Sequence, residues 1–396
     1  MLRMEPPLEL DVSVKALLKT AFFPDNTSTK SASFSVVGEN HPADVFFCVR
    51  TAWDAFLSAQ KFPAGSEILM SGINIPHMKE IVEAHGLTAR TLDICPNTLL
   101  PGLDDFKNGY TSRTVGVLCA HLFGTWSALT ELATWCRSKN IFLVEDCAQS
   151  FMGQDFTGTK TATATFFSFG TIKRSTCLGG AVALVREPEL RTKILSIESS
   201  YPRQKHSQVK KKARKTLLLK TLTLPRVYGV FVRTLRHLHI DHEEFIRNSV
   251  RGFPSAQVPF VFRMRPSHEL SKLVQKTWQK SSSFMWTERM TRIMEAAASA
   301  GIPRDRIPGN DAHFHTFWLL PVLCGNPKGV VETLRNEGLD ATRGLSSMKD
   351  LSDNPDSASA KILANLVFLP VSQRKIFPFT KARAALEIES TSASHL

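Results

Sequence analysis

This 396-residue chain has no run of about 18 apolar residues, the length that a membrane-spanning helix needs. Its first residues (MLRMEPP) also lack the basic stretch and apolar core of a secretory signal. No internal repeat is visible. We therefore expect a globular protein that neither crosses a membrane nor carries a secretory leader.

Cysteine is present, but never in the paired or CxxC spacing of a zinc site. The seven cysteines stand at positions 48, 95, 119, 136, 147, 177 and 324. An odd and dispersed set favours reduced thiols over a disulfide framework. We expect a cytoplasmic protein without a metal site.

Acidic residues are missing from one long segment, 199–240, which carries eleven Lys and Arg. The whole chain has 49 Lys and Arg against 36 Asp and Glu, so the remainder holds 38 bases against 36 acids. A basic excess confined to one segment does not support a nucleic-acid partner for the chain. Three uses of this basic segment stay open: a solvated helical arm, peripheral contact with an anionic membrane, or attraction of a negatively charged substrate.

The order of apolar and amphipathic stretches predicts an α/β fold with a mainly parallel sheet. The length favours two domains. We divide the chain into an N-terminal arm (1–43), a large domain (44–198), a basic helical insertion (199–260), and a helix with a small C-terminal α/β domain (261–396). The expected strands are 67–70, 88–93, 115–120, 142–145, 162–169, 181–185, 314–322 and 365–371. The expected helices are 51–60, 77–85, 128–139, 266–281 and 327–337, and the tail after 388 is expected to be frayed.

Two strand ends place reactive side chains where open α/β sheets bind ligands. Asp146 ends the apolar run 141–144, and Lys173 follows the aromatic strand 166–169, five residues after Ser168. A lysine that forms a Schiff base, an acid for a pyridinium nitrogen and a hydroxyl for phosphate are what pyridoxal 5'-phosphate (PLP) needs. Taken singly, each residue is more often an ordinary loop or strand residue, so the prediction depends on the three together.

A second contact with phosphate is expected at the start of the helix that follows Arg50 and Thr51. Free main-chain N–H groups at a helix start favour an anion. Thr51 can equally be a plain N-cap of that helix.

Several motifs in register resemble those of the DegT/DnrJ/EryC1/StrS aminotransferase family. They are residues 168–173 (SFGTIK), 144–149 (VEDCAQ) and 121–124 (HLFG), with residues 50–51 at the family's helix start. The resemblance covers about 44 to 195 and is weaker beyond. It implies a fold of PLP-dependent transferase type I and a homodimer.

The resemblance also implies roles for single residues. Lys173 would form the Schiff base and move protons, and Asp146 would hold the ring nitrogen. The resemblance further implies cofactor contacts for Gln149, Ser168 and Thr51, and His121 belongs to the matching turn. Arg50 and His77 are further candidate contacts at positions where the chain departs from the family. Members of the family mostly act on nucleotide-linked keto sugars, and those with histidine in place of the lysine are dehydratases, which Lys173 argues against.

Four departures from the family pattern concern the expected pocket. Arg50 stands where the family has a glycine before Thr51, and its side chain either adds charge to the phosphate site or narrows it. Ile75 stands where an aromatic usually stacks on the ring, and His77 could replace it. Residues 177–180 (CLGG) are shorter than the family's loop and lack its acid. No asparagine that could reach a neighbouring subunit's phosphate is found near Val261, where Arg263 or Arg265 could compensate.

The leading hypothesis is a PLP-dependent aminotransferase that moves an amino group from an amino acid to a keto sugar or similar carbonyl substrate. One alternative is a non-catalytic, membrane-apposed interaction protein on the same fold. The other is a PLP-dependent lyase or desulfurase, which Cys147 and Cys177 near the site would serve.

Overall fold

The computed structural model describes residues 4–7, 10, 12–22, 33–171, 173, 175–245, 258–281, 284–344 and 347–371. Its strands are β1 (Ser33–Phe34), β2 (Ala43–Phe46), β3 (Glu67–Ser71), β4 (Ile73–Asn74), β5 (Thr88–Leu92), β6 (Thr114–Ala120), β7 (Thr125–Trp126), β8 (Phe142–Cys147), β9 (Ala164–Ser168), β10 (Ala181–Val185), β11 (Phe314–His315), β12 (Leu320–Leu323), β13 (Lys349–Asp350) and β14 (Leu366–Leu369). Its helices are α1 (Val14–Phe22), α2 (Val49–Gln60), α3 (Pro76–Ala84), α4 (Leu103–Gly109), α5 (Thr130–Ser138), α6 (Pro188–Ser199), α7 (His206–Leu222), α8 (Pro225–His237), α10 (His268–Lys280), α11 (Phe284–Ser299), α12 (Pro327–Asn336) and α13 (Ala358–Asn365), with short 3₁₀ turns η1 (Phe260–Phe262) and η2 (Arg304–Arg306).

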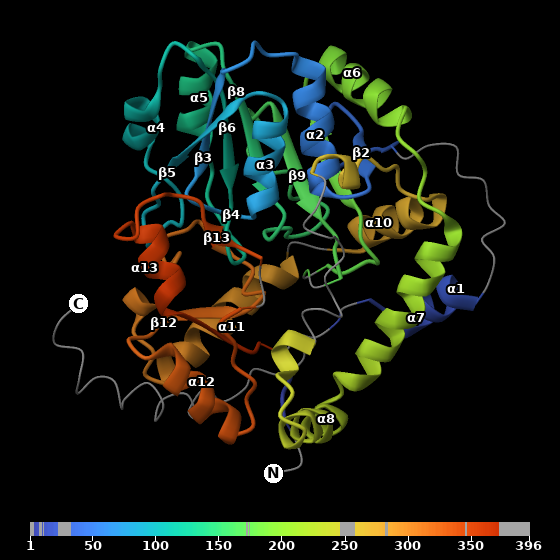
Figure 1. Cartoon of the computed structure of the whole chain (residues 1–396), viewed down its shortest axis with the longest axis vertical. Coiled ribbons are helices and arrows are strands. Elements are labelled where there is room, and N and C mark those ends of the chain that lie inside the picture. The colour runs from blue at the N-terminus through green and yellow to red at the C-terminus, as the bar shows by residue number, and fades with distance from the viewer. Residues whose placement is uncertain are drawn as a thin grey trace.

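An eight-stranded sheet in the order β1-β2-β10-β9-β8-β6-β3-β5 forms the centre of the larger body (Figure 1). Strands β5, β3, β6, β8 and β9 run parallel, whereas β10, β2 and β1 are joined to them by antiparallel pairing. The predicted α/β class with a mainly parallel sheet is therefore confirmed. The inner parallel strands β3, β6, β8 and β9 are almost fully buried because helices cover both faces.

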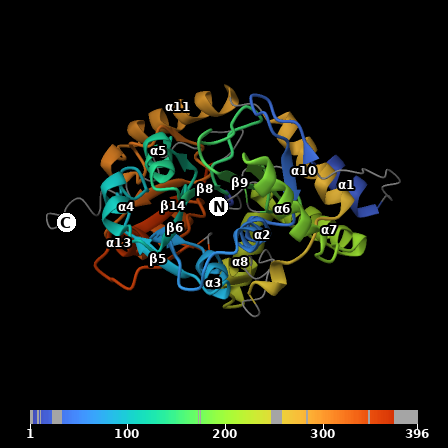
Figure 2. The ribbon, with the colours of Figure 1, turned by 90° about the horizontal axis from the view of Figure 1, so that it is seen from above.

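Two helical layers enclose this sheet (Figure 2). On one face α2, α3 and α6 pack over strand side chains such as Ile68, Val144 and Phe166. On the other face α4 and α5 pack over Leu69, Val117 and Leu143, and α10 covers the end of the sheet formed by β9, β10 and β2. The candidate site lies at the carboxyl ends of the parallel strands.

A smaller core lies beside the sheet and consists of α11, α12, β12 and β14. Strands β12 and β14 pair antiparallel. A third apolar cluster joins the two bodies, where Leu122 and Phe123 after β6 meet Leu319, Ile362 and Phe368. Within the described residues, no helix combines the length and apolar character needed to cross a membrane.

The single strand predicted over 314–322 is wrong. The structure has two short strands there, and each pairs with a different partner: β11 with β7, and β12 with β14. The break lies at Phe317, whose φ of 42° is in the left-handed region that extended chains avoid. The Phe317 N–H donates to the imidazole Nδ1 of His315 at 2.9 Å, and this local bond replaces a ladder bond.

The N-terminal arm contains more order than the sequence predicted. Helix α1 packs along α7, and β1 adds an edge strand to the sheet. The ammonium group of Lys220 donates to the carbonyl oxygens of Leu10 and Val12, which ties the arm to α7. The predicted frayed tail after 388 lies outside the described residues.

The basic segment forms two helices, α7 and α8, in the described structure. They are separated at Pro225, which stands at the first turn of α8, where the missing N–H of proline costs no intrahelical bond. The hydroxyl of Tyr228 on α8 donates to the carboxylate of Asp340, which also accepts from Arg335 and from His242. Helix α7 thus adjoins the large sheet's end and α8 is fastened to the smaller body.

Candidate active site at the carboxyl ends of the strands

Four of the predicted site residues follow or end neighbouring strands of the sheet. Asp146 lies in β8 and Ser168 ends β9, two strands that pair in parallel. His121 follows β6, and its main-chain N–H donates to the carbonyl oxygen of Asp146 at 3.0 Å. Lys173 lies in the loop between β9 and β10. The carboxyl ends of parallel strands meet at one edge, so these side chains come from one region of the sheet.

The ammonium group of Lys173 lies in an environment that disfavours its charge. Burial lowers the pKa of Lys173 to about 8, and the nearby Arg50 guanidinium acts in the same direction, whereas the Asp146 carboxylate opposes the shift. The Lys173 Nζ also lies 5.5 Å from the ring centroid of Trp318. A lysine with a lowered pKa is partly uncharged near neutral pH, which is the form that attacks an aldehyde.

Asp146 is the buried acid of the site, with 5% of its surface exposed. Its Oδ1 accepts the main-chain N–H of Ala148 at 2.9 Å. Burial raises the pKa of the Asp146 carboxyl, although the Ala148 bond and the charges of Lys173, His121 and Arg50 lower it in part. A protonated heterocyclic nitrogen would supply the direct counter-charge that such a carboxylate needs.

The start of α2 brings Arg50, Thr51 and His77 together. The Arg50 Nη1 lies 3.1 Å from the His77 Nδ1, and the guanidinium lies over the Phe262 ring at 4.7 Å. The Thr51 hydroxyl donates to the Phe262 carbonyl oxygen at 2.6 Å. Burial, with the charge of Arg50, lowers the pKa of His77. Because the Thr51 hydroxyl donates its proton to Phe262, it is not available as a donor to a phosphate. The donors that this turn can provide to an anion are the main-chain N–H groups at the start of α2.

His121 and Gln149 take up positions that the sequence could not specify. The His121 Nε2 lies 2.9 Å from the Glu145 Oε1, and the buried His121 Nδ1 has no partner in the described part of the chain. The Gln149 Oε1 accepts the N–H of Phe123 at 2.8 Å and so holds the turn after His121. A buried ring nitrogen without a partner is a polar atom that a bound ligand can satisfy.

Glu145, next to Asp146, has a structural role. Side chains alternate across a strand, so the two carboxylates point to opposite faces of the sheet. Glu145 accepts the Trp126 Nε1–H at 2.8 Å and the Thr159 N–H at 2.7 Å besides its contact with His121. Burial alone would raise the pKa of Glu145, but these donors hold it below its usual value. Glu145, His121 and Cys147 lie close enough for a metal ion, but protein donors already occupy both oxygens of Glu145.

The sequence prediction missed Lys212, which reaches the site from α7. A Cβ at Gly179 would lie 3.3 Å from the Lys212 Nζ, so glycine leaves room for the ammonium group there. Burial lowers the pKa of Lys212, and Arg50 and Lys215 lower it further, while Cys48 opposes them. Lys212 and Arg50 are thus two cations beside the start of α2. The only sequence signal was the lysine run itself, which did not say where α7 packs.

Trp318 is the second residue that sequence analysis missed. It is almost fully buried and belongs to the segment that connects β11 with β12. Its ring lies beside Lys173, whereas Ile75, where the family pattern has an aromatic, is the N-cap of α3. The left-handed turn at Phe317 directs the chain so that this indole comes next to the strand edge.

The two arginines considered as substitutes for the missing asparagine are engaged within the chain. Arg263 binds the fully buried carboxylate of Asp54 through two hydrogen bonds of 2.9 and 3.1 Å. Arg265 lies 3.4 Å from a carboxylate oxygen of Glu198. Lys212, by contrast, lies close enough to Arg50 for their charges to interact.

The residues of this region fit PLP. Lys173 and Arg50 stand near the buried Asp146, and Lys212 stands near Arg50, which leaves positive charge for a phosphate. Ser168 is half-buried, and the buried His121 Nδ1 has no hydrogen-bond partner among the described residues. The set therefore offers an amine, a carboxylate, phosphate ligands and an aromatic ring in one place.

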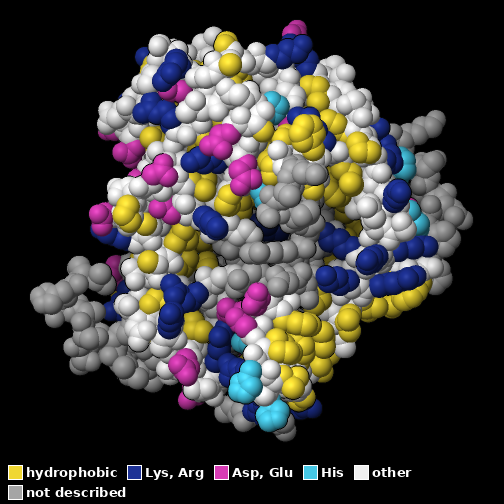
Figure 3. All heavy atoms as spheres, viewed as in Figure 1, with side chains coloured by type: hydrophobic (Ala, Val, Ile, Leu, Met, Phe, Trp, Pro, Cys, Tyr) yellow, Lys and Arg dark blue, Asp and Glu magenta, His cyan; other side chains and the backbone are white. Residues whose placement is uncertain are grey.

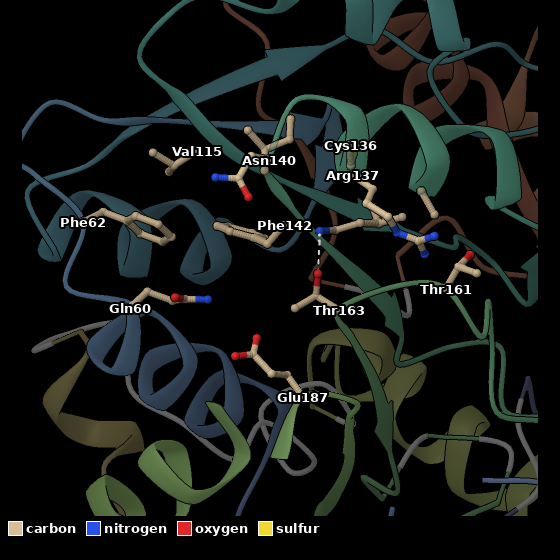
Figure 4. A pocket seen from close by; sticks show the side chains of 13 residues that line it. Gln60, Phe62, Val115, Cys136, Arg137, Asn140, Phe142, Thr161, Thr163 and Glu187 are labelled. Atoms are coloured by element: carbon tan, nitrogen blue, oxygen red, sulfur yellow. Dashed lines mark hydrogen bonds between the residues drawn. The ribbon is translucent and has the colours of Figure 1, made fainter. Parts of the chain in front are cut away.

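A separate cavity of about 470 Å³ lies at the opposite edge of the sheet. Figure 4 shows its side chains, with Val115, Phe142 and Thr163 at or beside the starts of β6, β8 and β9. The Leu143 N–H donates to the Thr163 Oγ1 at 3.1 Å across its floor. This cavity is at the amino ends of the strands and contains none of the predicted site residues.

Comparison with solved structures defines the fold class. An Escherichia coli GDP-4-keto-6-deoxy-D-mannose-3-dehydratase, solved with hydrated PLP bound, superposes with a TM-score of 0.66 at 15% identity, over 97% of this chain and 99% of that chain. NtdA from Bacillus subtilis, solved with bound cofactor PMP, gives a TM-score of 0.62 at 15% identity, over 89% of this chain and 74% of that chain. The chain has the fold of the PLP-dependent transferases of type I, as predicted.

The sequence comparison shows which family part of the chain is similar to. Residues 48–218 match the DegT/DnrJ/EryC1/StrS aminotransferase family. The dTDP-4-dehydro-2,3,6-trideoxy-D-glucose 4-aminotransferase of Saccharopolyspora spinosa is 28% identical over 171 residues, 41% of this chain and 44% of the relative. The GDP-perosamine synthase of Escherichia coli O157:H7 is 26% identical over 121 residues, 30% of this chain and 33% of the relative. In both alignments the chain spans less than half of the relative's length.

Proposed function

We propose that this chain is a PLP-dependent aminotransferase that moves an amino group from an amino acid to a free or nucleotide-linked keto sugar, or to a similar polar carbonyl substrate. The observation that carries the proposal is the lysine at 173, with its lowered pKa, among a buried acid and two further cations. The family match and the relatives that are named for sugar-nucleotide chemistry support the substrate class.

Each residue then has a specific task. Lys173 would hold the aldehyde carbon of PLP and afterwards carry a proton between two carbons of the substrate and cofactor. Asp146 would keep the ring nitrogen protonated, and Ser168, Arg50 and the N–H groups at the start of α2 would bind the phosphate. PLP, when bound, supplies an electron sink for the substrate's negative charge.

Other side chains would orient and enclose the reacting groups. Gln149 fixes the turn after His121, whose free Nδ1 would face the ligand, and Trp318 would exclude water beside Lys173. His77 would act through Arg50, which it contacts.

A lyase or desulfurase reaction has less support than amino transfer. Burial raises the pKa of the Cys147 thiol well above its usual value, so the thiolate that such chemistry uses is disfavoured. Cys177 is also buried, and its sulfur donates to the Thr277 hydroxyl at 2.8 Å. A non-catalytic role on the same fold is the competing proposal. Bleaching of the PLP band by an amino acid distinguishes the two.

We further propose that the protein is a cytoplasmic homodimer and that its basic segment, 199–240, makes peripheral contact with an anionic membrane. The family resemblance supports the dimer, and the reduced state expected of seven dispersed cysteines supports the compartment. Sedimentation equilibrium of the purified chain would measure the mass. A monomer at micromolar concentration would contradict the dimer.

The test of the activity is the absorption spectrum of the purified protein with PLP. We expect a visible band that borohydride removes, and bleaching of that band by at least one amino acid with release of its keto acid. The Lys173→Ala variant should lack the band and should release keto acid at least about 10²-fold more slowly. A wild-type protein without the band, or a variant that keeps a reducible one, would contradict the proposal, and a band that no amino acid bleaches would favour the non-catalytic alternative.

A further inference from the structure

Helix α8 exposes an apolar stripe to solvent. Val227 and Val230 are 39% and 52% exposed, and Leu224 and Leu238 at its two ends are 54% and 57% exposed. Leu224, Val227 and Leu238 share one side of the helix, since their spacings of three and eleven residues are close to whole turns. The packed side of the helix is formed by Tyr228, Gly229, Val232 and Leu235.

Cations adjoin this stripe on α8 and continue on α7. On α8, Arg226 and Arg233 are seven residues apart, about two turns, and so share a side of the helix between its apolar stripe and its packed side. On α7, Lys211, Arg214 and Lys215 are exposed, and Leu218 on the same side is 61% exposed. Figure 3 shows both features on one face, with dark-blue Lys and Arg over α7 and a hydrophobic area over α8. We call these exposed residues of the two helices the α7–α8 face.

Helix α1 repeats the same arrangement at the edge of this face. Val14, Leu18 and Phe22 follow one another at intervals of four residues and are 46%, 41% and 55% exposed. Lys15 and Lys19 are exposed next to them. The Arg214 guanidinium of α7 lies 5.3 Å from the Phe22 ring centroid, so the two helices share a border.

The α7–α8 face is built on anchored helices. Buried Tyr228 binds Asp340 below α8, and Lys220 binds the arm below α7. The burial of Val209, Ala213 and Thr216 fixes the rotation of α7. The exposure of the apolar stripe therefore follows from the packing of the opposite sides and cannot be relieved by rotation of the helices.

The charge of the α7–α8 face indicates which kind of partner it can bind: a second copy of the chain, a nucleic acid or a lipid surface. From Ser199 to Ile240 there are eleven Lys and Arg and no acid, so two copies docked through this face would bring like charges together. A nucleic acid would satisfy the cations but would leave the leucine and valine stripe in water. Exposed Asp241 and Glu244 mark the end of the face. A surface that offers anionic headgroups above an apolar interior satisfies both parts.

We propose that the α7–α8 face docks on the surface of an anionic phospholipid bilayer. The apolar stripe of α8 enters the headgroup boundary, and Lys211, Arg214 and Lys215 of α7 contact the lipid phosphates. The docking is peripheral, and the outward residues of both helices take no part in the proposed aminotransferase site.

The test is binding of the full-length protein to vesicles of phosphatidylcholine with and without phosphatidylserine. We expect binding to the mixed vesicles only, and weakening as salt is raised. The triple variant Lys211→Gln, Arg214→Gln, Lys215→Gln should bind roughly a hundredfold more weakly, since each cation near such a surface contributes about 1 kcal/mol. The double variant Val227→Ser, Val230→Ser should bind more weakly at every salt concentration, because it removes an apolar contribution that salt does not screen.

A matched control removes three exposed cations elsewhere, in the variant Lys139→Gln, Lys328→Gln, Lys361→Gln. These residues lie on other parts of the molecule, so this variant should bind as the wild type does. Circular dichroism and thermal melting would establish that each variant is folded. The PLP band of the double variant should equal that of the wild type, which separates failure of docking from failure of the proposed activity.

Three results would overturn the proposal. The first is equal binding to neutral and anionic vesicles, or none to either. The second is loss of binding in the control triple as large as in the α7 triple, which would indicate net charge alone. The third is tight binding of duplex DNA or RNA, or self-association, that depends on the α7–α8 face while vesicles do not bind.

Discussion

The amino group of Lys173 has a pKa of about 8, which is low for a lysine, and this value predicts a measurable pH dependence. Because burial disfavours the ammonium form, the uncharged fraction rises as pH increases through about 8, instead of through the ordinary value of 10.5. We expect the rate at which apoprotein forms its visible band with PLP to rise with pH and to level off above this midpoint. Stopped-flow absorbance across neutral and alkaline pH would measure it.

The neighbouring carboxylate provides a control for that midpoint. Asp146 raises the pKa of Lys173 by its charge, so Asp146→Asn should shift the midpoint to lower pH. A midpoint that stays near the value of a free lysine, or that does not respond to Asp146→Asn, would show that the two groups are not electrostatically coupled.

Lys212 allows a second prediction at the scale of single residues. If Lys212 and Arg50 both contact the cofactor's phosphate, Lys212→Gln should weaken the binding of PLP about tenfold, or ~1.4 kcal/mol. Inorganic phosphate should compete with PLP less well in this variant. Titration of the apoprotein by fluorescence would give both constants.

The adjacent lysine is the matched control. Lys211 is exposed on the outer side of α7, so Lys211→Gln changes the same charge one residue away without reaching the site. Equal loss of affinity in the two variants would mean that only the overall charge of α7 matters.

The sequence located the chemistry-bearing residues but could not show how they are assembled. Asp146, Ser168 and Lys173 follow apolar strands, and that local pattern was enough to predict one edge of a sheet. Lys212 and Trp318 come from segments that are distant along the chain, and only packing brings Trp318 to Lys173 and Lys212 to Arg50. The engagement of Thr51 with Phe262 depends on a contact between residues 211 positions apart and has no local signal.

At the scale of elements, α8 is held by one buried carboxylate, and this predicts a stability effect. Tyr228→Phe removes the hydroxyl that donates to Asp340 and leaves that acid with Arg335 and His242. We expect the free energy of unfolding to fall by about 1.5–3 kcal/mol, the usual range for a hydrogen bond to a charged group. Denaturant unfolding monitored by circular dichroism would measure the change.

Tyr110→Phe is the corresponding control, since it deletes a hydroxyl from a half-buried ring that packs against Trp135. It should cost much less. Amide exchange should also accelerate in α8 of the Tyr228→Phe protein before it does elsewhere, and a uniform change would argue against a local anchor.

Six of the eight strands of the large sheet could be predicted from sequence to within two residues at each end, whereas β1 and β2 were not predicted. Predicted 67–70, 115–120 and 181–185 correspond to β3, β6 and β10, because buried parallel strands are short apolar runs between turns. The predicted strand 314–322 failed because a left-handed Phe317 and the His315 imidazole interrupt it, and neither alters the apolar pattern. Helices α4, α6 and α11 were not predicted, since their polar faces gave a weak period.

At the scale of the whole molecule, the candidate site lies where the large sheet meets the smaller body. Lys173 belongs to the first and Trp318 to the segment that enters the second. We therefore expect PLP to protect amides from exchange on both sides, around 168–177 and around 314–320. Ligand at a hundredfold excess over its dissociation constant should add about 2.7 kcal/mol to the free energy of unfolding.

Hydrogen exchange with mass spectrometry would test this, with Lys173→Ala as the variant in which both effects should shrink. Protection confined to the sheet side would contradict a site shared by the two bodies. We propose, on the same grounds, that the chain divides into an arm (1–43), a large domain (44–198), a helical insertion (199–260) and a helix with a small domain (261–396). Limited proteolysis would locate the boundaries.

Helix α7 turns Lys212 inward, toward Gly179 and Arg50, and Lys211 and Lys215 outward, and this has a thermodynamic consequence. A rigid helix cannot be tilted on one side without moving the other. If the outer side is held by lipid, the inner ammonium group shifts with it, and linkage then requires that vitamin B6 occupancy and vesicle affinity change each other by the same factor. This 17-residue helix would thus couple vesicle binding on its outer side to cofactor binding on its inner side.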